Sequence, residues 1–246
     1  YEFSKLVKEK LIVANGLPIH NTTYGLEDDS DFSAQNIKII NGNYVFDVVT
    51  PTDSITDVVF SLPGRHNVMN AMAALSMANS YGVSLADIKE SLATFQGVKR
   101  RFAYKIKTDD FVLIDDYAHY PTEIAAVANS VKEMYRDIKS LVVFQPHLYS
   151  RTRDFVDDFA KSLALFDEVL LLDIYPAREL PIEGITSDWL LSKIKKNQKK
   201  MTSKTTLVSD IQKTNAQVVA LLGAGDIGLL VDEVTFQLNK LQENEV

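Results

Sequence analysis

The sequence predicts an α/β protein whose C-terminal part contains a mostly parallel β-sheet and whose N-terminal part is smaller and mainly β. Two observations carry this prediction. After Gly97, short continuous apolar runs alternate with helical segments, which is the pattern of strands buried on both faces of a parallel sheet. Before Pro63, β-branched residues alternate with polar ones, which is typical of strands with one buried face.

The N-terminal part is predicted to be mostly β over residues 1–62 and helical after that. The dipeptide Asn41-Gly42 between two β-rich runs predicts a tight hairpin turn. A helix is expected over residues 67–80. A second helix is expected to begin near Ser84, because Ser84 and Asp87 have the spacing of a capping box.

The C-terminal part is predicted to alternate strands with helices. The strands are expected at Phe111–Ile114, Leu141–Phe144, Val169–Leu172, Thr206–Ser209 and Val218–Leu222, and the helices at 121–137, 151–165, 187–197 and 226–240. The domain boundary is placed at Gly97–Arg101, where the pattern changes. The short basic run Lys193–Lys200 predicts a solvated helix end.

Composition narrows the function. The chain has 246 residues and is 46% hydrophobic, which is ample for a large buried core. A net charge of −7 argues against nucleic-acid binding, which needs a basic surface. There is no cysteine and no apolar run long enough to span a membrane. We therefore expect no nucleic-acid or membrane partner; the absence of cysteine is compatible with a cytoplasmic protein, and local charge clusters still allow a small anionic ligand.

Chemically active residue types gather after the predicted strands of the C-terminal part. The segments are Asp115–Pro121, Gln145–Arg153, Asp173–Glu179 and Gly223–Gly228. Because ligands bind at the carboxyl ends of parallel strands, these segments predict a functional cleft. Structural roles are the alternative. His119 and His147 can each be structural residues, and Asp115 and Asp116 can cap a helix instead of binding a ribose or a metal.

Three other patterns allow more than one interpretation. Gly223–Gly228 has the spacing G-x-G-x-x-G but lacks the second strand of a dinucleotide-binding unit, so we expect a tight strand-to-helix turn. His66, Asn67 and Asn70 can grip a flat heterocycle, although Asn67 can also be an N-cap. The basic cluster Gly97–Phe102 is either a functional hinge or a solvated linker.

In order and spacing, these motifs resemble those of the Mur ligases. The resemblance implies that residues 1–97 are the C-terminal portion of a central ATP-binding domain and residues 98–246 a Rossmann-like, amino-acid-binding C-terminal domain. The family joins an amino acid to a UDP-muramoyl carboxylate through an acyl phosphate, with ATP and Mg²⁺, during peptidoglycan biosynthesis in the cytoplasm. The segment Gln145–Asp154 looks most like the members that add L-alanine to UDP-N-acetylmuramate.

The resemblance also implies roles for individual residues. His66, Asn67 and Asn70 would hold the adenine, Asp116 the ribose, and Arg101 the ATP phosphates or the closed state. Tyr117, His119, His147 and Arg151 would line the L-alanine site, with Arg151 pairing with the carboxylate. Arg101 and His119 are the residues expected to take part in catalysis. Two positions depart from the family: Tyr120 replaces a frequent second histidine, and Leu148 a common basic residue.

The phosphate-binding loop of the family, G-x-x-G-K-[ST], occurs nowhere in this sequence. We therefore expect a C-terminal fragment that is inactive alone, whose Mg²⁺ ligands and UDP-binding domain lie upstream. The missing initial Met and the amphipathic stretch Phe3–Val13, typical of the middle of a domain, point the same way. Two alternatives remain: a murein-peptide ligase that recycles UDP-linked peptides, and a nucleotide-binding module without catalysis.

Overall fold

A computed structural model describes residues 22–27 and 29–244. Two compact units make up the chain. Unit 1 comprises the described residues of Tyr1–Ser61 together with His66–Phe95, and unit 2 those of Leu62–Arg65 and Gln96–Val246. The predicted amphipathic stretch at residues 3–13 lies outside the described residues, and the predicted domain boundary between residues 97 and 98 stays a prediction.

Unit 1 contains a four-stranded sheet in the order β1-β2-β3-β4. The strands are β1 (Tyr24–Leu26), β2 (Phe32–Ile40), β3 (Asn43–Val49) and β4 (Ser54–Phe60). β1 runs parallel to β2, and the other neighbours are antiparallel. Asn41 and Gly42 join β2 to β3 with φ angles of 52° and 73°, which only a turn with two left-handed residues provides. The predicted hairpin is therefore confirmed.

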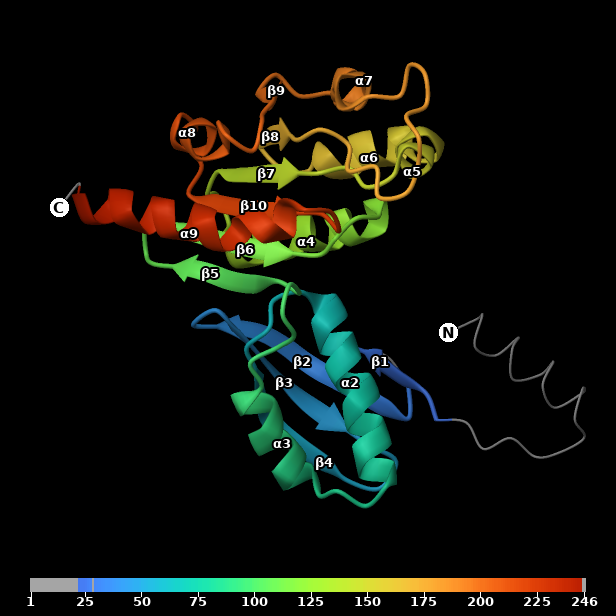
Figure 1. Ribbon diagram of the computed structural model, residues 1–246. Coiled ribbons are helices and arrows are strands. Elements are labelled where there is room, and N and C mark those ends of the chain that lie inside the picture. The colour runs from blue at the N-terminus through green and yellow to red at the C-terminus, as the bar shows by residue number, and fades with distance from the viewer. Residues whose placement is uncertain (1–21, 28, 245–246) are drawn as a thin grey trace, which may run out of the picture. The chain divides into compact units, whose positions relative to one another are not determined.

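Two helices follow the sheet in the described part of unit 1 (Figure 1), as predicted. Helix α2 (Arg65–Ser80) buries Val68, Met72 and Leu75 on one face and leaves Asn70 exposed. Helix α3 (Leu85–Thr94) packs against β4. The Ser84 side chain accepts from the Asp87 backbone N–H at 3.2 Å and donates to the Asp87 carboxylate at 2.6 Å, which caps α3 as predicted.

Unit 2 is built on a six-stranded sheet in the order β5-β6-β10-β7-β8-β9 (Figure 1). The strands are β5 (Ala103–Lys107), β6 (Val112–Asp116), β7 (Ser140–Phe144), β8 (Glu168–Leu171), β9 (Lys199–Met201) and β10 (Val218–Leu222). All neighbours are parallel except β5, which runs antiparallel to β6. The α/β class with a mostly parallel C-terminal sheet is thereby confirmed.

Helices cover both faces of this sheet because its buried residues alternate between two apolar cores. On one face, α4 (Pro121–Met134), α6 (Val156–Leu163) and α7 (Ser187–Lys193) pack on side chains such as Ile114 and Phe144. On the other, α8 (Leu207–Gln212) and α9 (Ile227–Asn244) pack on side chains such as Leu113 and Val143. Successive strand residues thus point to opposite cores.

The strand order brings the carboxyl ends of distant segments together. β10 comes last in the sequence but lies between β6 and β7. The residues that follow β6, β7 and β10 are therefore neighbours at one edge of the sheet. From β6 the chain crosses over to β7, and it later returns to place β10 between them. Open α/β sheets bind ligands where the order of strands reverses in this way.

One predicted strand, Thr206–Ser209, is wrong. These residues begin helix α8, and the strand in this region is β9, seven residues earlier in the chain. The run of threonines resembles a strand, but the Thr206 hydroxyl accepts from the Ser203 N–H and the Ser203 hydroxyl accepts from the Thr206 N–H just before the helix. Leu207 and Ile211 form the buried face of the helix at helical spacing. The basic run Lys193–Lys200 is also not a helix end alone, because its last two lysines belong to β9.

Two further boundaries differ from the prediction. The predicted helix 151–165 is divided at Phe155 into α5 (Tyr149–Asp154) and α6, where the Phe155 ψ of 21° departs from helical values. Strand β5 was not predicted, because it is an edge strand that alternates lysines with Tyr104 and Ile106 rather than a continuous apolar run.

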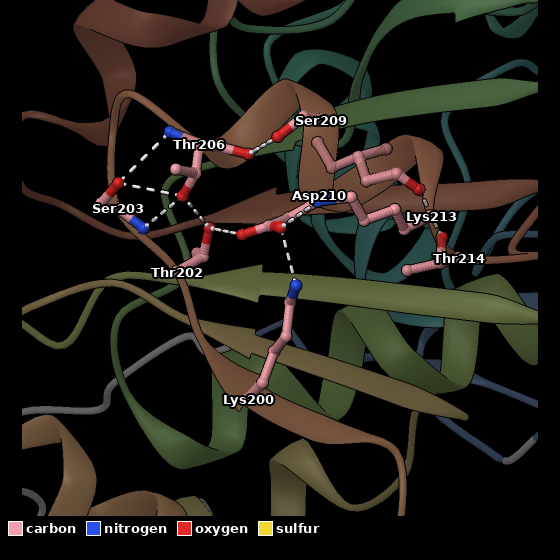
Figure 2. Close-up of polar contacts among 9 residues, drawn as sticks. Lys200, Thr202, Ser203, Thr206, Ser209, Asp210, Lys213 and Thr214 are labelled. Carbon is pink, nitrogen blue, oxygen red and sulfur yellow. Dashed lines mark hydrogen bonds and ion pairs between the residues drawn. The ribbon is translucent and has the colours of Figure 1, made fainter.

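A buried carboxylate ties β9 to α8 (Figure 2). Asp210 accepts from the Lys200 ammonium at 2.7 Å and from the Thr202 hydroxyl at 2.8 Å, and its side chain is 9% exposed. The bond from Lys200 is the main reason that the pKa of Asp210 is lowered to about 2, with help from Thr202 and against the effect of burial. This network holds the loop between β9 and α8, which carries Lys204 toward the carboxyl edge of the sheet.

Candidate functional site

Aromatic and imidazole rings from three loops gather at the carboxyl edge of the unit 2 sheet. The rings of Tyr117 and His119, after β6, lie 5.2 Å apart edge to face. His119 lies 6.2 Å from His147, which follows β7. His147 in turn stacks on Tyr175, after β8, with ring centres 5.6 Å apart. The structure therefore brings together residues 117, 119 and 147, which the sequence assigned to one site.

Arg151 joins this cluster from the first turn after β7. Its guanidinium lies 4.2 Å from the centre of the Tyr120 ring and donates to the His147 Nδ1 atom at 3.3 Å. Among the described residues, no carboxylate lies within ion-pairing distance of Arg151. A half-buried guanidinium held by an aromatic ring and a neutral acceptor keeps N–H donors for an anionic ligand.

The two histidines are held as opposite tautomers. The Nδ1 atom of His119 lies 3.0 Å from the Tyr117 carbonyl oxygen and 3.2 Å from the Glu123 carboxylate; both oxygens accept, so this nitrogen carries a proton. His147 receives a hydrogen bond on Nδ1 and is therefore unprotonated there. Burial, with the charge of Arg151, lowers the pKa of His147, so this ring is neutral at neutral pH.

Backbone geometry aims His147 at the cluster. The chain continues the β7–β8 pairing past the strands, because the Leu148 N–H donates to the Tyr175 carbonyl at 3.0 Å and the Tyr175 N–H to that of Pro146 at 2.8 Å. Leu148 has a φ of 75°, a strained value for a residue with a side chain. Such strain is typical of functional sites, and here it turns the chain from the strand into helix α5.

Asp116, predicted to bind a ribose, has both carboxylate oxygens in use. One accepts from the Phe102 backbone N–H and the other from that of Ala118, each at 2.7 Å. Burial raises the pKa of Asp116 to about 6 in spite of these two bonds. Each oxygen retains one lone pair, so the carboxylate can still accept from a ligand hydroxyl.

The two arginines of the basic cluster have different surroundings. Arg101, predicted to bind phosphates, is exposed and its side chain has no partner among the described residues. Its neighbour Arg100 is anchored: Nε lies 3.2 Å from the Asp115 carboxylate, and a terminal nitrogen donates to the Gly223 carbonyl at 2.6 Å. Arg101 is thus the arginine of this pair that is free to meet an anion.

The residues predicted to hold adenine lie on helix α2 in unit 1. His66 and Asn70 are exposed, whereas Asn67 is 7% exposed. The Asn67 amide is thus largely removed from solvent, but the alternative prediction that Asn67 is an N-cap is wrong, because α2 begins at Arg65 and Asn67 lies within its first turn. Among the described residues, no group of three His, Asp or Glu side chains is placed to hold a metal ion.

Gln145 opens one of the segments predicted to line the cleft, but the sequence assigned it no individual role. This 3% exposed side chain donates to the Asp226 carboxylate at 2.7 Å and accepts from the Ile227 N–H at 2.8 Å. Lys204 pairs with the other Asp226 oxygen. These side chains border a cavity of about 380 Å³ beside Tyr175. A polar residue directly after an apolar strand was the available signal.

Unit 2 is an α/β domain whose mostly parallel sheet carries the ring cluster at the carboxyl ends of its strands, the position at which such sheets bind ligands. Residues 100–231 match the Mur ligase glutamate ligase domain, and residues 6–78 match the Mur ligase middle domain. The chain belongs to the Mur ligase family, which confirms the resemblance noted from its motifs.

Individual relatives agree with this assignment. The chain is 57% identical to a UDP-N-acetylmuramate–L-alanine ligase of Christiangramia forsetii and 55% identical to one of Flavobacterium psychrophilum. Each match covers 95% of this chain and 52% of the relative, so the chain spans about half the length of these curated relatives.

Solved structures show the same architecture. A UDP-N-acetylmuramate-alanine ligase from Thermotoga maritima matches with a TM-score of 0.71 and 26% identity over 92% of this chain and 49% of that one. A folylpolyglutamate synthase from Mycobacterium tuberculosis, at 18% identity and a TM-score of 0.65 over 85% and 48%, shares the fold alone. In the part of the chain that the structure describes, no helix is long and apolar enough to cross a membrane.

Proposed function

We propose that this chain is about half of an ATP-dependent ligase that joins L-alanine to the carboxylate of UDP-N-acetylmuramate in peptidoglycan synthesis. The observation that supports this most is the convergence of Tyr117, His119, His147 and Arg151 from two loops far apart in the sequence. The names of the relatives agree with it.

In this proposal, unit 2 binds the amino acid. The guanidinium of Arg151 pairs with the carboxylate of L-alanine through its free N–H donors. An amine must be neutral before it attacks an acyl phosphate, and in this proposal His119 accepts the proton on Nε2, because Nδ1 is engaged by the Tyr117 carbonyl and the Glu123 carboxylate. His147, whose pKa is lowered by burial and by the charge of Arg151, forms the wall opposite His119.

The nucleotide roles are proposed separately for each unit. In unit 2, Asp116 binds a ribose hydroxyl, and the exposed Arg101 binds phosphate. In unit 1, the exposed side chains of His66 and Asn70 bind the adenine, with Asn67 beside them. ATP would supply the phosphoryl group that activates the acceptor carboxylate.

Calorimetric titration of this chain with L-alanine tests the amino-acid site. We expect saturable binding that Arg151→Ala weakens by about tenfold or more, as for the loss of a charge-assisted hydrogen-bonded pair. Arg153→Ala is the matched control, because Arg153 pairs with exposed Asp154 on the same helix. Equal weakening by both substitutions would contradict the role of Arg151.

A second experiment tests activity. Because the sequence contains no G-x-x-G-K-[ST] loop, the chain alone is proposed to release no phosphate from ATP in the presence of L-alanine and UDP-N-acetylmuramate. Phosphate release that depends on both substrates would refute this. Binding of L-alanine in preference to a free murein peptide would separate the proposal from a murein-peptide ligase, because both ligands would enter the same site in unit 2.

A further inference from the structure

The turn Gly223–Gly228 has the glycine spacing of a dinucleotide-binding loop, yet atoms of this protein lie against each of its three glycines. A Cβ atom at Gly225 would lie 2.5 Å from Gln145 Oε1 and 2.7 Å from Tyr175 Cβ. A Cβ at Gly228 would lie 2.5 Å from a terminal nitrogen of Arg100. The space that the glycines leave is thus filled by this protein's own side chains.

Arg100 makes contacts in three directions. Its Nε meets the Asp115 carboxylate at 3.2 Å, and a terminal nitrogen donates to the Gly223 carbonyl at 2.6 Å. The guanidinium also lies 5.1 Å from the centre of the Tyr117 ring, and the Arg100 carbonyl accepts from the Tyr117 N–H at 2.8 Å. With 18% exposure and a φ of 60°, the residue is built into the fold rather than held on its surface.

These contacts form a closed circuit of neighbouring residues that includes both histidines. From Arg100, the circuit runs through Tyr117, His119, His147, Tyr175 and the glycine turn, and returns to Arg100. Each member touches the next, so a change at Arg100 reaches His119 through Tyr117. It reaches His147 from the other side, through the turn and Tyr175.

We propose that Arg100 is a positioning residue that locks the glycine turn against Tyr117 and thereby sets the placement of His119 and His147. The turn then serves as a wall of the amino-acid pocket and not as a cradle for phosphate. This inference rests on the proposed function only in naming L-alanine as the ligand, because the circuit of contacts is independent of it.

Arg100→Lys is the sharpest perturbation. Lysine keeps the positive charge beside Asp115 but lacks the planar group that reaches Gly223 and Tyr117 together. In NMR spectra of this chain, we expect weaker cross-peaks between the Tyr117 and His119 rings and shifted signals of both His119 and His147. The His66 signal, from unit 1, should not change. Arg153→Lys is the matched control and should leave all of these signals in place.

Gly228→Ala provides a second perturbation that leaves Arg100 itself intact. The added methyl group must displace the guanidinium, so we expect the same changes at His119 as in Arg100→Lys. Unchanged ring cross-peaks in both variants would overturn the proposal. So would shifts of equal size at His66, since these would indicate general unfolding.

Titration of the same samples with L-alanine separates this inference from the proposed function. We expect Arg100→Lys to raise the apparent Kd by about tenfold or more, as small misplacements of binding groups do. If the wild-type chain shows no response to L-alanine, the proposed function fails for this chain, while the cross-peaks still decide the role of Arg100. Wild-type affinity in Arg100→Lys would overturn the positioning role.

Discussion

Asp210→Asn should destabilise unit 2 strongly at neutral pH and less in acid. The wild-type carboxylate has a pKa of about 2, compared with 3.8 for an ordinary aspartate. A carboxylate with a lowered folded pKa contributes stability above the unfolded pKa and loses it as pH falls through the folded pKa. Asparagine keeps the shape of the side chain but carries no charge for Lys200 and Lys213.

The magnitude follows from the difference between the two pKa values. A difference of nearly two pKa units corresponds to an upper bound of about 2 kcal/mol at pH 7. Lys200 is 47% exposed, and solvent screening lowers the expected loss to between about 1 and 2 kcal/mol. At pH 3, where the ordinary carboxyl is mostly protonated and this one is not, the same linkage leaves about half of the effect.

Urea unfolding followed by fluorescence measures this loss within unit 2. The chain has one tryptophan, Trp189 on α7, so its emission reports on unit 2. Asp158→Asn is the matched control, because Asp158 meets Lys161 at 3.3 Å with a 60% exposed side chain. We expect its cost to be about 0.5 kcal/mol or less. An Asp210→Asn loss that is equal at pH 7 and pH 3, or no larger than the control, would refute the reasoning.

Three further predictions concern other residues. Arg151→Gln should raise the pKa of His147 toward its ordinary value, because the charge of Arg151 helps to lower it; NMR titration of the imidazole checks this, and a lower pKa would contradict it. Asp116→Asn should leave a backbone N–H unpaired and cost about 1–3 kcal/mol. Urea unfolding should show that this cost shrinks as pH rises from about 4 to about 6. The folded pKa of Asp116 is raised, so the wild-type protein loses stability as this carboxyl ionises, whereas the asparagine variant does not. A cost that grows with pH would contradict the prediction. Ser84→Ala should cost about 1 kcal/mol through loss of the α3 cap, seen as faster amide hydrogen exchange in α3; unchanged exchange would show that the cap is dispensable.

Features that depend on residues close together in the chain could be predicted from the sequence. Continuous apolar strands such as Leu141–Phe144, the hairpin at Asn41-Gly42 and the cap at Ser84 depend on local chemistry, and the structure contains all three. The convergence of His119 and His147 was also predictable, since parallel strands end at one edge.

What the sequence could not show depends on contacts between distant residues. The threonine run at 205–206 looks β-like by propensity, but its hydroxyls and the burial of Leu207 favour a helix. Arg100 and Arg101 are adjacent and chemically identical. Only the folded neighbours Asp115 and Gly223, one of them 123 positions away, distinguish the anchored arginine from the free one.

The two edges of the unit 2 sheet have a consequence for association between chains. Each edge strand carries two lysines: Lys105 and Lys107 on β5, and Lys199 and Lys200 on β9. Several are held by neighbouring groups, as in the bond of the Lys199 ammonium to the Leu191 carbonyl at 2.8 Å. A strand from a second molecule would have to pair beside these charges and disturb their partners. The lysines thereby protect the edge strands against pairing with other molecules into aggregates, while the carboxyl ends of the strands remain open to small ligands.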